Sequence, residues 1–218
     1  ALLIPMDDAQ KNHLKAYGLT YWALDVPQKY QAEWLLNYRG GSFLIKETGR
    51  CLQKAAAMGV SCQVVSPQQI SSIYQTIEQE NMERILLEKA PKVAVYTPPD
   101  KEPWDDAVTL ALTYAEIPYE TLWDNEVLLG RLPNYDWLHL HHEDFTGQYG
   151  KFYRNFHNQP WYQQQVKRFE ETAREAGFSC VQEHKAAVAA RILEYVSQGG
   201  FLFAMCAATD SLDIARAA

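Results

Sequence analysis

The stretch FLFAM, residues 201–205, decides the predicted fold of this chain. Four of its residues are large and apolar, and no polar residue alternates with them, which is typical of a strand buried on both faces of a sheet. KVAVY, residues 92–96, has the same character. Such runs alternate along the chain with longer amphipathic segments, of which residues 181–200 are the clearest. This order predicts a mostly parallel sheet with helices on both faces, a three-layer α/β/α fold.

The individual elements follow from the same periodicities. The predicted strands are residues 1–6, 32–38, 60–66, 92–96, 119–123, 136–140 and 201–205, with 41–45 as a short strand or a loop. The predicted helices are residues 11–25, 47–59, most of 66–86, 104–117, 151–156, 160–177 and 181–200.

The 218 residues suffice for one large domain or two small ones. Two similar series of strands and helices cover residues 1–66 and 92–206, and a polar segment, residues 67–91, separates them. We expect a single α/β domain over residues 1–218, or two lobes, 1–66 and 92–218, joined by 67–91. The last residues, DIARAA, look like the beginning of a helix, which suggests a fragment of a longer chain.

Composition narrows the range of partners. The net charge is −7 and no cluster of Lys or Arg occurs, which argues against nucleic acid as a partner. No run of about 18 apolar residues predicts a membrane span. The four cysteines are widely spaced without a CxxC pair, which disfavours a cysteine-based zinc site and a disulfide scaffold. We expect a small-molecule substrate or ligand, no cofactor, and a homo-oligomer as one option.

Position 1 is Ala rather than Met. This agrees with an exported, periplasmic protein whose signal peptide has been removed, or with the boundary of a fragment. The cysteine content does not distinguish between cellular compartments.

Ligands of open parallel sheets bind beyond the carboxyl ends of the strands. This rule selects the loops 37–41, 97–103, 141–147 and 205–210.

The sharpest candidate in these loops is Cys206. A turn between a strand and a helix can hold a nucleophile, and such a turn requires small neighbours, which Ala207 and Ala208 are. A helix N-terminus there would favour the thiolate, and the N–H group of Ala207 would help to bind an oxyanion. The alternative is a buried cysteine that only packs.

A second candidate is the group of ionisable residues that directly follows strand 136–140. Its members are His141, His142, Glu143 and Asp144. They could supply a general base for Cys206 or ligands for a metal ion. Adjacent residues rarely all converge on one ion, so we assign no metal. The alternative is a loop that only caps and hydrogen-bonds.

Two further features belong to the candidate site. An aromatic run has helical spacing and comprises Phe145, Tyr149, Phe152, Tyr153 and Phe156. It predicts either a helical segment packed over the sheet end or a lid that stacks on a ligand, with Tyr149 as the binding candidate. In the loop TPPDKEPW, Asp100 and Glu102 are candidates for orienting a base or binding a ligand.

The segments KVAVYTPP, YDWLHLHHEDFTGQYGKFYR and GGFLFAMCAATDSLDIA, in this order, resemble a bacterial family labelled "asparagine synthetase B". The resemblance covers most of the chain and implies a class I glutamine amidotransferase-like, flavodoxin-like domain. In that superfamily the nucleophile lies in a G-x-C-x-G turn, and residues 204–208 match its cysteine and small residues but not its glycines. The superfamily's catalytic His and Glu follow the nucleophile, whereas residues 207–218 contain neither.

Two functions follow as expectations. The first is a Cys-dependent hydrolase or amidotransferase-like protein acting on a small amide or ester, in which Cys206 attacks a carbonyl carbon and His141 or His142 is the base. The second is a non-catalytic ligand- or partner-binding domain of an exported protein.

Overall fold

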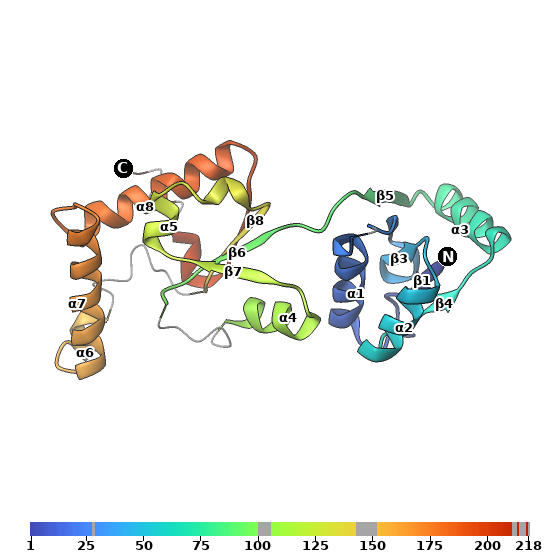
Figure 1. Ribbon diagram of the computed structural model, residues 1–218, viewed down its shortest axis with the longest axis horizontal. Coiled ribbons are helices and arrows are strands. Elements are labelled where there is room, and N and C mark those ends of the chain that lie inside the picture. The colour runs from blue at the N-terminus through green and yellow to red at the C-terminus, as the bar shows by residue number, and fades with distance from the viewer. Residues whose placement is uncertain (28, 100–105, 143–151, 211–212, 214–216, 218) are drawn as a thin grey trace. The chain divides into compact units, whose positions relative to one another are not determined.

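The computed structural model describes residues 1–27, 29–99, 106–142, 152–210, 213 and 217. The chain forms two compact units (Figure 1). We call Ala1–Ala90 with Leu110–Pro118 the N-terminal unit, and Pro91–Thr109 with Tyr119–Ala218 the C-terminal unit. Among the helices of the described residues, none has the length and apolar character that crossing a membrane requires.

The N-terminal unit contains an antiparallel sheet of five strands in the order β4-β1-β3-β2-β5. Its elements are β1 (Leu2–Ile4), α1 (His13–Asp25), β2 (Ala32–Leu36), β3 (Ser42–Ile45), α2 (Gly49–Met58), β4 (Gln63–Val64), α3 (Pro67–Gln79) and β5 (Glu83–Leu87). The first six elements have the chain order and strand order of a split β-α-β, or ferredoxin-like, arrangement, to which α3 and β5 are added.

The prediction of a single, mostly parallel three-layer sheet is wrong, because the chain builds this antiparallel sheet and a separate parallel one. The reason lies in the burial of β1 and β3, whose residues are all buried. Helices α1 and α2 pack on the side of Leu2 and Ile45, and α3 packs on the side of Leu3 and Leu44. An antiparallel sheet covered on both faces has the same uninterrupted apolar strands as a parallel one.

The loop 37–41 was predicted to lie at the ligand-binding edge of a parallel sheet, but it forms the hairpin between β2 and β3. Its backbone is left-handed at Asn37, Arg39, Gly40 and Gly41. At Gly40 a Cβ atom would lie 2.4 Å from the Met6 carbonyl oxygen, so only glycine fits. This tight turn reverses the chain direction.

The segment 67–91, expected as a polar linker, contains two elements. Ser66 caps α3 in a capping box with Gln69, so the predicted helix is present. Strand β5 was missed, and it pairs along its whole length with β2. Residues 83–86 were predicted to continue the helix, because the short apolar run of Ile85, Leu86 and Leu87 has no periodicity that distinguishes a strand from a helix end.

The C-terminal unit contains a parallel sheet of four strands in the order β7-β6-β8-β9. Its elements are β6 (Val93–Tyr96), β7 (Tyr119–Leu122), α5 (Asp124–Leu128), β8 (Trp137–Leu140), α6 (Tyr153–Phe156), α7 (Pro160–Glu175), α8 (Val181–Ser197), β9 (Phe201–Ala204) and the 3₁₀ turn η5 (Cys206–Thr209). Helix α4 (Ala107–Ala115) begins in this unit, and its residues from Leu110 on belong to the N-terminal unit. The parallel pairing expected for the runs 92–96 and 201–205 is present here. The predicted burial of 201–205 on both faces is wrong, because β9 is the edge strand of the sheet and Phe201 and Phe203 are exposed. Helix α5 was not predicted.

The core of the C-terminal unit includes a buried charge pair on the side of the sheet covered by α5 and α8. The Lys185 ammonium donates to the Asp124 carboxylate at 2.5 Å, and the Tyr96 hydroxyl donates to the same carboxylate at 2.6 Å. The Lys185 nitrogen also lies 3.9 Å from the centre of the Trp123 ring. Burial lowers the pKa of the neighbouring His184, although Asp124 raises it. These contacts join β6, α5 and α8.

Candidate active site at the carboxyl ends of β6, β8 and β9

The parallel sheet has a topological switch point between β6 and β8. Strand β6 has β7 on one side and β8 on the other, so the two successive crossovers run in opposite directions. Open α/β sheets bind ligands beyond the carboxyl ends of the strands at such a point. The residues that follow β6 and β8 there are Thr97 and His141. The topology therefore selects the histidine-containing loop.

Asp106 lies at the centre of this edge, directly before α4. Its side chain is 1 % exposed, and its Oδ1 atom accepts hydrogen bonds from the backbone N–H groups of Val108 at 2.7 Å and Thr109 at 3.2 Å. An acceptor at this position caps the helix N-terminus. The Oδ2 atom accepts from the His142 N–H at 2.8 Å. One carboxylate thus fixes both the start of α4 and the chain after β8.

The pKa of Asp106 reflects opposing effects. Burial alone would raise it, but the hydrogen bonds from the His142 N–H and from the His139 imidazole lower it to about 2. Asp106 is therefore ionised at neutral pH and is a buried anion beside the histidines.

His139, on β8, is the closest of these histidines to Asp106 and is fully buried. Its Nε2 lies 3.1 Å from Asp106 Oδ2, and its Nδ1 lies 3.1 Å from the Phe203 carbonyl oxygen. Both neighbouring atoms are hydrogen-bond acceptors, and the tautomer of the ring sets which nitrogen donates. His139 is thus a structural partner of Asp106 and ties β8 to β9.

His141 and His142 complete the cluster. The buried His141 continues the β6–β8 pairing, since its N–H donates to the Tyr96 carbonyl at 3.2 Å. His142 has a side chain that is 34 % exposed, and its Nδ1 lies 3.6 Å from Asp106 Oδ2. The two imidazole rings are 4.4 Å apart between centroids. His142 is therefore the imidazole of the cluster that combines a carboxylate neighbour with access to solvent.

Cys206 lies where the sequence pattern predicted it, in the turn that follows β9. It is exposed, and its φ of +56° is left-handed, which is uncommon for a residue other than glycine. Parallel pairing matches Leu140 with Ala204. His142 follows Leu140 by two residues and Cys206 follows Ala204 by two residues, so both lie just beyond the ends of neighbouring parallel strands. Ala207 and the buried Ala208 follow in η5, as the small neighbours that such a turn requires.

The structure gives no position for the other residues that the sequence predicted for the site. Asp100, Glu102, Glu143, Asp144 and Tyr149 lie outside the described residues. Sequence reasoning missed Asp106, which the structure places at the centre of the cluster. Its signal was an acidic residue directly before a helical pattern, the position of an N-cap.

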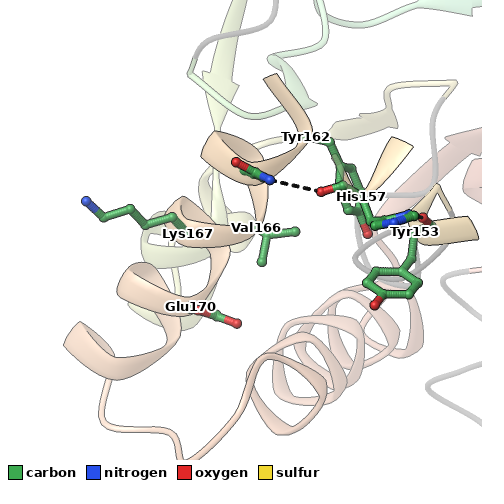
Figure 2. Close-up of a pocket in the computed structure, with 7 residues that line it drawn as sticks. Tyr153, His157, Tyr162, Val166, Lys167 and Glu170 are labelled. Atoms are coloured by element: carbon green, nitrogen blue, oxygen red, sulfur yellow. Dashed lines mark hydrogen bonds between the residues drawn. The ribbon is translucent and has the colours of Figure 1, made fainter. Parts of the chain in front are cut away.

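The aromatic segment contributes a separate pocket of about 480 Å³ beside α6 and α7. Figure 2 shows its lining: Tyr153, His157, Tyr162, Gln163, Val166, Lys167 and Glu170. The Gln163 amide donates to the His157 carbonyl at 3.1 Å, and the Tyr153 and His157 rings are 5.1 Å apart. These contacts join α6 to α7, as packing of an inserted helical segment requires.

Comparison of the chain with protein-family models, curated proteins and solved structures finds no match. The function is therefore argued from the site itself.

Proposed function

We propose that this chain is a Cys-dependent hydrolase or amide-transfer enzyme that acts on a small amide or ester. The observation that carries the proposal is the exposed Cys206 in a left-handed turn after β9, the strand that pairs with β8, which His142 follows. Non-glycine residues in this conformation cost about 1–3 kcal/mol and concentrate at active sites. A strained, accessible thiol at the ligand-binding edge of a parallel sheet is a suitable nucleophile.

The arrangement supports a nucleophile, a base and an orienting acid in that order. Cys206 is the nucleophile, and His142 is the base because its imidazole is partly exposed. Asp106 orients His142 in two ways, since it accepts from the His142 N–H and lies 3.6 Å from Nδ1. In the proposed mechanism His142 Nδ1 moves into hydrogen-bond distance of this carboxylate, which favours the tautomer with the hydrogen on Nδ1 and leaves Nε2 as the proton acceptor.

The reaction then proceeds in two halves. His142 Nε2 takes the Cys206 proton, the thiolate sulfur bonds to the substrate carbonyl carbon, and the carbonyl π electrons move to oxygen. The N–H of Ala207 contributes to oxyanion binding. When the carbonyl re-forms, the carbon–nitrogen or carbon–oxygen bond breaks, and the leaving group takes the proton from His142. Water, or an amine in a transfer reaction, gives a proton to His142 and displaces the cysteine sulfur, which recovers its proton.

The test is hydrolysis of glutamine and of p-nitrophenyl acetate by the full chain. Cys206→Ala should lower the rate about 10³-fold or more, and His142→Gln about 10²-fold to 10⁴-fold. Cys180→Ala is the matched control, because Cys180 is also exposed but lies before α8, and it should retain the wild-type rate. Equal rates for wild type and Cys206→Ala would refute the proposal and favour a non-catalytic ligand-binding domain.

A further inference from the structure

We propose that Asp106, His141 and His142 form a binding site for one divalent transition-metal ion of the zinc class. Each residue offers one ligand atom, and the three atoms all lie within 4.8 Å of one another. Zinc binds nitrogen and oxygen at about 2.0–2.2 Å in tetrahedral geometry, which places ligand atoms about 3.4 Å apart. Small side-chain rotations close this difference, and the partly exposed His142 has the most freedom to make them.

The donor set determines the class of ion. Imidazole nitrogen suits zinc, copper, iron and nickel, whereas magnesium and calcium prefer sites made of oxygen ligands. Two imidazoles and one carboxylate supply three protein ligands, and a fourth position stays open for water or an anion, as in catalytic zinc sites.

The surroundings of the cluster have the features of a second coordination shell. The Val108 N–H and the His139 imidazole both contact the Asp106 carboxylate. Such outer-shell contacts orient metal ligands. The hydroxyl oxygen of Thr97 is buried and has no hydrogen-bond partner among the described residues. Because Tyr96 pairs with Leu140, Thr97 is level with His141 at the edge of the cluster. A buried hydroxyl there can hydrogen-bond to a water on the ion.

The metal has a consequence that rests on the proposed function. A neutral imidazole has one nitrogen lone pair. When either nitrogen of His142 binds the ion, the other carries the hydrogen, so His142 cannot serve as ligand and as base for Cys206 at once. A bound ion therefore inhibits hydrolysis, and a chelator restores it.

The test is a titration of the untagged full chain with Co²⁺, the spectroscopic probe of zinc sites, followed by displacement with Zn²⁺. We expect visible absorption that saturates at about one ion per chain and disappears when zinc is added. His142→Gln should weaken zinc binding about 100-fold or more, since loss of an outer-shell contact alone costs about 10-fold to 100-fold. His157→Gln is the matched control, because His157 is an exposed histidine on the pocket beside α7, and it should bind as the wild type does.

Folding is monitored by circular dichroism, and the exposure of His142 makes its substitution mild. No cobalt absorption in the wild type, or unchanged zinc affinity in a folded His142→Gln variant, would overturn the metal site. The two proposals fail separately. If hydrolysis requires Cys206 but the chain binds no metal, the hydrolase proposal stands and the metal site is refuted. If the chain binds metal but Cys206→Ala hydrolyses as fast as the wild type, the metal site stands and the hydrolase proposal is refuted.

Discussion

The left-handed backbone at Cys206 predicts an unusual order of stability among substitutions at this position. An L-residue in this conformation costs about 1–2 kcal/mol, and glycine avoids this cost. Glycine also has more freedom in the unfolded chain, which costs about 0.4–1 kcal/mol relative to alanine. The difference favours Cys206→Gly over Cys206→Ala by about 0.5–1 kcal/mol in the free energy of unfolding. Because Cys206 is exposed, removal of its sulfur contributes little in either variant.

The assay is urea-induced unfolding, with hydrogen exchange of β6 and β8 amides as the probe local to the C-terminal unit. The control is Lys167, an exposed residue in the interior of α7. Lys167→Gly should be less stable than Lys167→Ala by about 1 kcal/mol, the ordinary helical order. If alanine at position 206 is as stable as glycine or more so, the turn is not strained and the reasoning fails. Cys206→Gly should also lose hydrolysis while it gains stability relative to alanine.

Three other predictions concern buried groups. Lys185→Met should destabilise the C-terminal unit by about 3–5 kcal/mol in urea unfolding, because it leaves Asp124 buried without its ammonium partner; a loss below about 1 kcal/mol would contradict this. Burial lowers the pKa of His184, next to Asp124 and Lys185, so the unfolded state binds its proton more readily. The free energy of unfolding should therefore fall as the pH drops below about 6.5. His184→Phe should reduce this dependence on pH, and an unchanged dependence would contradict the prediction. Burial raises the pKa of the Cys51 thiol to about 12, so iodoacetamide at pH 8 should label Cys51 only when the chain unfolds. The exposed Cys206 should be labelled in the folded chain, and peptide mapping distinguishes the two sites.

The sequence predicts most helices and strands but not the directions of the strands in the N-terminal unit. Its periodicity reports burial, and β1 and β3 are buried on both faces by α1, α2 and α3. Strand direction depends instead on the hairpin at 37–41, whose left-handed residues reverse the chain. In the C-terminal unit the same apolar pattern belongs to a parallel sheet.

The sequence predicts those residues of the candidate site that directly follow a strand. His141, His142 and Cys206 each follow a strand, and the carboxyl ends of neighbouring parallel strands meet at one edge. Asp106 is not predictable in this way, because its contacts join residues 33 and 36 positions apart through the return of the chain to α4. Whether an acid before a helix only caps it or also binds a distant loop depends on tertiary packing.

Mass spectrometry of the acyl-enzyme tests most directly whether Cys206 is the nucleophile. The full chain is mixed with p-nitrophenyl acetate, quenched with acid at successive times and digested. We expect the peptide with Cys206 to gain an acetyl group faster than the peptide with Cys180, and then to lose it as the thioester is hydrolysed. Acetylation of Cys206 that is no faster than that of Cys180, or that never turns over, would contradict it.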